Sequence, residues 1–551
     1  MKSEQPNRSI LKKIQDRYLI ERIDHSNARR FFEINHASYA NIVHKENEKP
    51  IFFFNASTRM NRLSLNAAFA WLTAADLQNS GVPIRFLYCK AGLKPCLLAA
   101  KMGTSLCREC VAFSNQMLDG MDNIGLEFID NQELSNQVEG LQGDQLNSFT
   151  YQNVPLGELT LPSLRWILRR HHLEKVPEAD PLHRQFIRSA WSTLLQAKAA
   201  IDEQEPRAIV LFNGLQYPEA IVKWYGRKQE IPVYTHEIGL MPYTAFFTEG
   251  EATACPIELP ENFTMTSERN ERLDTYLSGR MRGNFTTAGI QFWPEMKSLS
   301  PDFWKLARTF RQIVPVFTNV VFDTSQYHAN VVFSNMFEWL DEVKMIIQNH
   351  GDTLFIIRAH PDEIRPGKES LETVADWVSE NQLTHLPNCL FVGPDQYFSS
   401  YELIQNSKFV MVYNSTIGLE AAVMGAAVLC GGKSRYTQIP VCWFPPTKEK
   451  FREQAELFLN SETINIPPEY QKTARKFMYY QFFHTALSFS EFIEPDPVWK
   501  GYVKLKKFSN DQLSGGKNIN LKVIENGILN RQPFVLPDLE EDTKISEEKK
   551  E

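Results

Sequence analysis

The sequence predicts an α/β fold in which two doubly wound, Rossmann-like domains face a cleft. Two observations predict it: short apolar runs alternate with helix-length amphipathic segments, and they do so in two separate series. In the first series, strand-like runs at 50–55 and 82–89 flank a helical pattern at 61–81. The second series begins at 313–325 and continues through a strand-like run at 353–361. Such units build parallel sheets covered by helices, and these sheets bind ligands at the carboxyl ends of their strands.

Changes in composition along the chain suggest where the domains begin and end. The first 45 residues are charged and helix-like, with no obvious partner in the sequence, and 250–300 is rich in Pro, Thr and Asn, as expected of an irregular connector. The expected segments are a helical arm (1–45), a first Rossmann-like domain with a cysteine cluster (46–290), a second Rossmann-like domain (300–465), crossover helices (466–510) and a charged, partly disordered tail (511–551).

Composition excludes several classes of protein. The chain is 43% hydrophobic and 23% charged, as folded globular proteins are, and its net charge of −7 provides no general basic field for nucleic acid. The N-terminus lacks the apolar core of a signal peptide, and polar residues break the most apolar long window, 409–432. We therefore expect a cytoplasmic protein. Arg165, Arg169 and His172 share one predicted helix face, which is either solvated or in contact with a lipid-linked phosphate acceptor or an anionic membrane surface.

The first candidate site lies in FIIRAHPDEIRPG (355–367). Its apolar residues predict a buried strand, so Arg358 and His360 lie where the strand ends, and Pro361 fixes the exit. As an i, i+2 pair, Arg358 and His360 leave one face of an extended strand and can both donate to a phosphate. The alternative is a surface pair of Arg358 with Asp362 beside a packed histidine.

The second candidate site lies in VYNSTIGLEAAVMG, where a strand runs into a helix. Asn414, Ser415 and Thr416 all suit a helix N-cap, and a helix N-terminus with nearby hydroxyls can bind an anion. Glu420 lies about one turn further on the same face and is placed to meet a ribose hydroxyl. The alternative is a well-capped helix with a solvated Glu420.

The third candidate site is PVYTHEIG (232–239), an apolar strand that ends in His236 and Glu237 with a glycine to turn the chain. Because neighbouring strand residues face opposite ways, only one of these two side chains can face the cleft unless the strand has already ended. The alternative is an ordinary strand exit.

Four of the eight cysteines fall in one short stretch, with a Cys-x2-Cys pair at its end. In a reducing compartment this arrangement suits a tetrahedral zinc or an iron–sulfur cluster, although the irregular spacing leaves free thiols as an equal alternative. The four candidate ligands are Cys89, Cys96, Cys107 and Cys110.

Several of these motifs occur together with a recognisable order and spacing. VFTNVVFDT, MFEWLDEV, IIRAHPDE, YELI and VYNSTIGLEAAVMGAAVLCGGKSRY fall in sequence between about 310 and 440. In this order they resemble the carboxyl-terminal half of bacterial capsule and surface-polysaccharide glycosyltransferases of the GT-B fold. The resemblance is to the capsular Kdo-transferase group and, more distantly, to the bacterial sialyltransferases with a His-Pro motif.

The resemblance implies roles for the candidate residues. His360 with Pro361 would contact the donor phosphate with help from Arg358, while the helix start at Asn414, Ser415 and Thr416 would hold the same phosphate and Glu420 the ribose. The first domain would bind the acceptor and supply the base: Glu237 resembles the catalytic carboxylate, with His236 as the competing candidate. The Kdo enzymes typically carry a Lys before His-Pro, which is absent here, so the donor sugar stays open.

These roles together predict a glycosyltransferase that moves a sugar from a nucleotide-sugar donor to a growing capsule or lipopolysaccharide-type surface glycan, free or lipid-linked. No D-x-D triad marks a metal-bound nucleotide, so we expect catalysis without a cofactor, and any zinc or iron–sulfur cluster would be structural. The alternatives are a CDP-glycerol-type glycerophosphotransferase, a non-hydrolysing sugar epimerase, and a non-catalytic polysaccharide-assembly protein of the same fold. We expect the protein in the cytoplasm, with peripheral contact at the inner face of the membrane as a further expectation.

Overall fold

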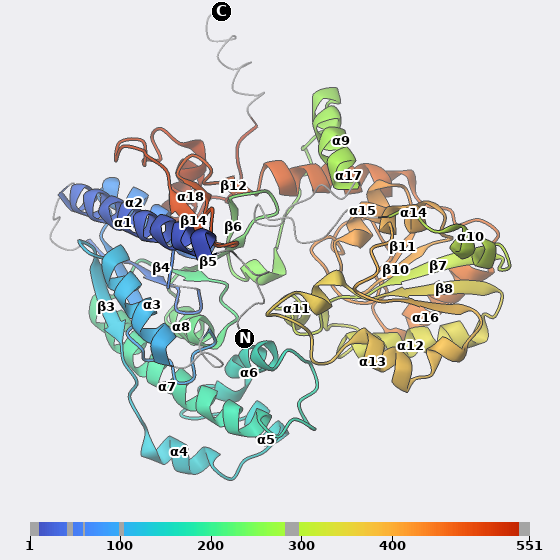
Figure 1. Cartoon of the computed structure of the whole chain (residues 1–551), viewed down its shortest axis with the longest axis horizontal. Coiled ribbons are helices and arrows are strands. Elements are labelled where there is room, and N and C mark those ends of the chain that lie inside the picture. Colours follow the sequence, from blue (N-terminus) through green and yellow to red (C-terminus); the bar gives the residue numbers. More distant parts are fainter. Residues whose placement is uncertain (1–9, 41–47, 59–60, 99–103, 282–296, 539–551) are drawn as a thin grey trace, which may run out of the picture.

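The computed structural model shows two α/β halves, each built around one main sheet (Figure 1). It describes residues 10–40, 48–58, 61–98, 104–281 and 297–538. Among these residues, no helix is long and apolar enough to cross a membrane.

The first half contains a seven-stranded sheet with the order β12-β6-β5-β4-β1-β2-β3. Strands β1 to β5 pair in parallel, whereas β6 runs antiparallel to β5 and β12 antiparallel to β6. The carboxyl ends of the five parallel strands therefore meet at one edge. The strands are β1 (Ile51–Phe54), β2 (Ile84–Cys89), β3 (Asp122–Leu126), β4 (Ala208–Phe212), β5 (Val233–Ile238), β6 (Thr244–Glu249) and β12 (Leu487–Ser488).

The second half contains a five-stranded, fully parallel sheet with the order β11-β10-β7-β8-β9. The chain reverses its direction of winding after β9, so β7 and β10 are neighbours at a switch point where ligands commonly bind. The strands are β7 (Gln312–Phe317), β8 (Thr353–Arg358), β9 (Cys389–Val392), β10 (Val410–Val412) and β11 (Val428–Cys430); a separate hairpin joins β13 (Ile493–Pro495) to β14 (Val503–Leu505).

Helices cover both faces of the sheets, as the apolar strand sequences require. In β1, Ile51 and Phe53 pack into one buried cluster and Phe52 and Phe54 into another, so both faces of the strand are covered. The helices are α1 (Ile10–Ala40), α2 (Leu65–Asn79), α3 (Thr104–Met117), α4 (Gln132–Val138), α5 (Asp144–Asn147), α6 (Leu156–Leu168), α7 (Ala179–Gln204), α8 (Tyr217–Lys228), α9 (Ser267–Met281), α10 (Pro301–Ala307), α11 (Gln326–Ala329), α12 (Met336–Asn349), α13 (Val374–Glu380), α14 (Ser400–Gln405), α15 (Ile417–Val423), α16 (Lys448–Asn460), α17 (Pro468–Phe483) and α18 (Ile519–Asn530), with short 3-10 turns η1 (Ala252–Ala254), η2 (Pro361–Ile364) and η3 (Leu383–His385).

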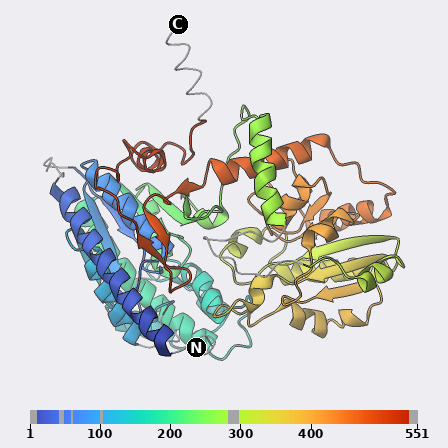
Figure 2. The ribbon, with the colours of Figure 1, turned by 45° about the horizontal axis from the view of Figure 1, so that its top comes forward.

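The chain returns to the first half after completing the second. Figure 2 shows α17 running across from the second half, and β12, just after it, pairs with β6 in the first sheet. The two halves are thus connected a second time by the return of the chain through α17 to β12. The prediction of a wholly irregular connector at 250–300 is wrong in part, because 267–281 forms helix α9; 282–296 lies outside the described residues.

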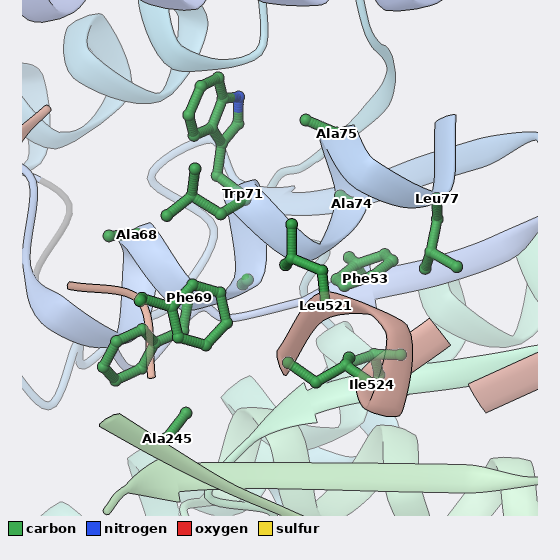
Figure 3. Close-up of a cluster of buried hydrophobic side chains, with 14 of the residues drawn as sticks. Phe53, Ala68, Phe69, Trp71, Ala74, Ala75, Leu77, Ala245, Leu521 and Ile524 are labelled. Carbon is green, nitrogen blue, oxygen red and sulfur yellow. The ribbon is translucent and has the colours of Figure 1, made fainter. Parts of the chain in front are cut away.

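The first and last described helices, α1 and α18, are part of the first half, which corrects two expectations. The arm predicted to lack a partner packs on α2, where the Phe31 and Trp71 rings lie 4.9 Å apart and the Trp71 indole donates to Asn35. Within the predicted tail, α18 packs Leu521 and Ile524 against α2 (Figure 3). The part of the tail beyond residue 538 lies outside the described residues.

Basic residues at the end of α6 and just after it include two that contact the second half of the protein. Arg169 forms an ion pair of 2.7 Å with Glu369, and the Nδ1 atom of His172 lies 2.5 Å from Glu372. Arg165 donates to the backbone carbonyl of His171, 3.1 Å away. Arg169 and His172 therefore contact the second half, while His172 stays exposed and Arg165 bonds within the first half. Contact of this surface with a membrane stays a prediction.

Glu219 of α8 is a fully buried carboxyl group in the first half. Its Oε1 accepts from the Ser57 backbone N–H at 2.7 Å, and burial raises its pKa to about 8. In the unfolded chain the group loses its proton near its ordinary pKa of about 4.3. Between these values the folded state binds more protons, so stability falls as pH rises.

We predict that Glu219→Gln removes this contribution to the pH dependence. The variant should match the wild type near pH 4 and exceed its unfolding free energy by a few kcal/mol at pH 8. Urea unfolding across this range measures the difference, with exposed Glu203→Gln as the control. A variant that is less stable than the wild type at pH 8 would contradict the prediction.

Candidate active site

A cavity of about 330 Å³ lies where residues from both halves meet at the carboxyl edge of the second sheet. Because β7, β8, β10 and β11 run in parallel, the loops that follow them converge on this edge, and η1 of the first half closes it. The lining residues are Thr253, Ala254, Cys255, Asn319, Val320, Asp323, Ser325, His328, His360, Asp362, Asn414, Ser415, Thr416, Lys433, Ser434 and Arg435.

His360 lines the cavity with a fixed tautomer. It caps η2, and its Nδ1 accepts from the Asp362 backbone N–H at 3.1 Å, so the ring proton of the neutral form is on Nε2. Burial lowers the pKa of His360, which favours that neutral form. Pro361 occupies the first position of η2, where a missing N–H costs nothing. His360 can therefore act as a neutral, directed hydrogen-bond donor.

The turn between β10 and α15 brings three predicted residues to the same cavity. Asn414 is oriented by its Oδ1, which accepts from Gln326 at 3.0 Å, and the Ser415 carbonyl accepts from the Tyr436 hydroxyl at 2.7 Å. Close packing of Tyr436 requires Gly418, since a Cβ there would lie 2.2 Å from the Tyr436 oxygen. This packing positions Ser415 and Thr416 in the cavity wall.

Two cationic residues of the cavity were missed by sequence reasoning. Lys433 and Arg435 follow β11 directly, in the CGGKSR segment, and both line the cavity. Arg435 also donates to the Cys255 sulfur of the first half at 3.6 Å. The signal that could have identified them is the same one used for His360: polar residues immediately after a buried parallel strand.

The structure places Glu420 and Arg358 away from the cavity lining. The buried Glu420 carboxylate is 2.7 Å from Arg280 and accepts from the Tyr401 hydroxyl at 2.6 Å, so the predicted contact with a ribose gains no support. Arg358 ends β8 and is buried, and burial lowers its pKa to about 10, which still leaves it protonated at neutral pH. Of the predicted i, i+2 pair, only His360 reaches the cavity wall.

The two candidate bases on β5 face different surroundings. The His236 ring stacks on Phe247 with 5.2 Å between centroids, and neither ring nitrogen has a hydrogen-bond partner among the described residues. Burial lowers the pKa of His236 to about 3, so it stays neutral and accepts no proton at neutral pH. This side chain is part of the core.

Glu237 is the half-buried member of the pair. Its pKa is raised to about 7, chiefly by burial and to a smaller extent by the negative charge of Asp323, which lines the cavity, while a hydrogen bond from Asn213 opposes the shift. The Asn213 amide nitrogen lies 2.5 Å from the Glu237 carboxylate. Glu237 therefore titrates near neutral pH; it is not itself part of the cavity lining, but the charge of the lining residue Asp323 acts on it.

Asn213 is a further residue that sequence reasoning missed. Its Oδ1 accepts from the backbone N–H groups of Leu215 and Gln216, which turns its amide N–H toward Glu237. Its backbone is left-handed, with φ of 61°, as Asn tolerates better than most residues. An Asn-Gly pair after a buried strand could have indicated this turn.

We predict that Asn213→Gly raises the pKa of Glu237 above about 7. Glycine keeps the left-handed backbone but removes the donor that stabilises the carboxylate. An NMR titration of ¹³C-labelled glutamate side chains measures the shift, with Asn66→Gly as a control elsewhere in the same half. An unchanged or lower Glu237 pKa would show that the hydrogen bond does not act on the carboxylate.

The four clustered cysteines line one apolar cavity, separate from the cavity of His360. In the part of the chain that the structure describes, no three His, Cys, Asp or Glu side chains form a group that could hold a metal ion. Burial also raises the pKa of the Cys89 thiol, which disfavours the thiolate form that binds metals. These two observations give no support to a structural zinc or iron–sulfur cluster. Metal binding by Cys89, Cys96, Cys107 and Cys110 stays a prediction.

Comparison with known proteins links the second half to capsule synthesis. Residues 303–456 match the family model described as capsule polysaccharide biosynthesis protein. The predicted resemblance is confirmed for this part of the chain. No curated protein matches the sequence.

Solved structures similar to this chain include a Kdo transferase and a UDP-GlcNAc 2-epimerase. The Thermosulfurimonas dismutans KpsC β-Kdo 2,4 transferase aligns with a TM-score of 0.33 and 11% identity, over 56% of this chain and 87% of that one. The Neisseria meningitidis UDP-GlcNAc 2-epimerase aligns with a TM-score of 0.24 and 11% identity, over 79% and 99%. The chain's own parallel sheets confirm the predicted fold class, two α/β halves in the GT-B arrangement.

Proposed function

We propose that this protein is a glycosyltransferase that moves a sugar from a nucleotide-sugar donor to a growing capsule or lipopolysaccharide-type surface glycan. The observation that carries the proposal is the cavity between the halves, whose lining holds side chains suited to bind phosphate, together with a carboxyl group with a pKa of about 7 on which the charge of the lining residue Asp323 acts. The match of residues 303–456 to capsule polysaccharide biosynthesis proteins supports the same class of pathway.

On the donor side, the phosphate would lie against the wall formed by the second half. The Nε2–H of His360 and the hydroxyls of Ser415 and Thr416 supply directed hydrogen-bond donors, and Lys433 and Arg435 supply positive charge. As the bond between the sugar and the phosphate breaks, the electron pair stays on the phosphate oxygen. These groups would stabilise that developing charge.

On the acceptor side, Glu237 would act as the general base of an inverting transfer. The carboxylate takes the proton of the acceptor hydroxyl as the acceptor oxygen forms its bond to the anomeric carbon. A base with a pKa of about 7 suits this step, because it is largely deprotonated at neutral pH yet still accepts a proton. Asn213 would hold the carboxylate in place.

We further propose that catalysis needs no metal ion, since Lys433 and Arg435 can supply the charge that a metal would otherwise provide. We place the reaction in the cytoplasm, where nucleotide sugars are made.

Incubation with nucleotide-activated sugars, followed by product analysis with and without EDTA, tests the class of reaction. A glycan extended by one sugar in both conditions supports the proposal. Transfer of glycerol phosphate from CDP-glycerol would instead indicate a glycerophosphotransferase, and an epimerised donor would indicate a sugar epimerase. Absence of any product would indicate a non-catalytic assembly protein.

We predict that kcat/KM rises with pH through about 7 and then levels off, because the base must be deprotonated. Glu237→Gln should lower kcat at least a hundredfold and remove this pH limb, while nucleotide binding stays unchanged. pH–rate profiles of the two proteins measure both effects. If Glu237→Gln keeps near-normal turnover and His236→Ala is inactive, the general base is His236 and not Glu237.

We also predict that Lys433→Ala raises the donor KM at least tenfold, with the fold intact. A charge-assisted hydrogen bond to phosphate is worth roughly 1.5–3 kcal/mol. Steady-state kinetics with varied donor provide the measurement, and His360→Ala should weaken donor use to a similar degree. The matched control is Lys450→Ala, an exposed lysine on α16. If the donor KM is unchanged in both Lys433→Ala and His360→Ala, the donor does not bind at this wall of the cavity.

A further inference from the structure

Helix α1 runs along the outer surface of the first half and has two unlike faces (Figures 1 and 2). Its inner face is anchored, because Ile23 and Phe31 are buried and the Asn27 side chain accepts from the Leu505 backbone N–H of β14 at 3.0 Å. Four large apolar side chains on the opposite side are more than half exposed: Leu11 (75%), Ile14 (61%), Tyr18 (66%) and Phe32 (52%). Apolar side chains gathered on one face, unlike scattered ones, mark an interaction surface.

The spacing along this outer face is that of a coiled-coil seam. Steps of three and four residues alternate from the first apolar residue to the last, which is the period that keeps one stripe of a helix against a partner helix. The seam residues are Leu11, Ile14, Tyr18, Glu21, His25, Ala28 and Phe32. All of them are exposed except Ala28, which is half-buried. The seam is therefore open over about six turns of helix.

The polar residues in the middle of the seam favour a second copy of the same helix in one orientation. In a parallel pair, Glu21 would face Glu21 and Arg17 would lie beside Arg22, so like charges would repel. In an antiparallel pair centred between Tyr18 and Glu21, each Tyr18 meets Glu21 of the second copy. The tyrosine hydroxyl can then donate to the carboxylate. The seam is thus complementary to itself only when the two helices run in opposite directions.

Charged side chains beside the seam are complementary in the same antiparallel arrangement. Arg17, whose side chain is 84% exposed, would lie next to Asp24 of the second copy, and the two-fold symmetry repeats this pair. Asp24 lies 3.4 Å from Arg62, and the negative charge of Asp496 also acts on it. Two carboxylates therefore lie beside one arginine here, and a further arginine from a second copy would be attracted to them.

We propose that the seam of α1 joins two copies of the chain into an antiparallel dimer with two-fold symmetry. Leu11 packs on Ala28 of the second copy and Ile14 on His25, at both ends of the contact. The Tyr18–Glu21 pairs lie at its centre. The contact spans residues 11–28 of each helix, a length of about 27 Å. One helix from each copy forms a small interface, so the dimer should dissociate reversibly on dilution.

Analytical ultracentrifugation of the full chain at several concentrations tests the dimer. The wild type should pass from monomer to dimer as the concentration rises. Ile14→Glu places a charge at an apolar position of the seam and should raise the dissociation constant at least tenfold. The matched control is Lys13→Glu, an exposed lysine of the same helix that lies off the seam. A monomeric wild type at all concentrations, or equal dissociation constants for Ile14→Glu and the wild type, would overturn the proposal.

A charge-reversal cycle tests the antiparallel arrangement. Arg17→Glu should weaken the dimer at least fivefold, because it places a carboxylate beside Asp24 of the second copy. The double variant Arg17→Glu with Asp24→Arg restores opposite charges and should recover most of the lost affinity. In a parallel dimer, Arg17→Glu would remove the repulsion from Arg22. A tighter dimer in the single variant, or no recovery in the double variant, would overturn the arrangement.

An anionic membrane is the other occupant that an apolar row flanked by Lys12 and Lys13 could take. Cosedimentation with phosphatidylglycerol vesicles separates the two. The proposal predicts that the wild type and Ile14→Glu do not differ in vesicle binding. A monomeric wild type whose vesicle binding is lost in Ile14→Glu would assign the face to a membrane and overturn the dimer. None of these measurements includes a sugar donor, so their outcome is independent of the proposed function.

Discussion

Parallel pairing of strands is the constraint on which the rest of this structure depends. Each sheet has fully buried central strands, such as β1 and β8, and parallel strands of this kind need helices on both faces and a crossover after each strand. Every crossover starts at the same edge of its sheet, so the polar residues after the strands converge. His360, Ser415 and Lys433 come from strands far apart in sequence and line one cavity for this reason.

Burial then gives adjacent residues different chemistry. On β5, His236 turns into the core, where removal from water keeps it neutral, while the half-buried Glu237 accepts a hydrogen bond from Asn213 and has a pKa of about 7. The same removal from water would favour the neutral thiols of the cysteine cluster, as it does for Cys89. Removal from water thus keeps His236 neutral, raises the pKa of Glu237 and favours the neutral thiol of Cys89. The order of residues along the chain does not show how strongly each side chain is removed from water.

Much of the fold could be predicted because strand identity depends on local sequence. Runs such as IFFF and LFII are too short and too apolar for anything but buried strands, and residues following them are at strand ends whatever the tertiary structure. That logic identified His360, Ser415 and Thr416, and applied to β11 it would also have identified Lys433. The helix α18 was missed because its short pattern lies beside a charge-dense tail, and its partner α2 lies more than 400 residues earlier. The ion-pair partner of Glu420 could not be predicted either, because Arg280 is 140 residues away in the chain.

The central claim is that one cavity between the two halves holds the donor phosphate beside Glu237. A crystal structure of the protein with a nucleoside diphosphate tests it most directly. The account predicts phosphate oxygens within about 3.2 Å of His360 Nε2 and of the Ser415 or Thr416 hydroxyl, with Lys433 close by. A nucleotide bound elsewhere, for example at the carboxyl edge of the first sheet alone, would contradict it.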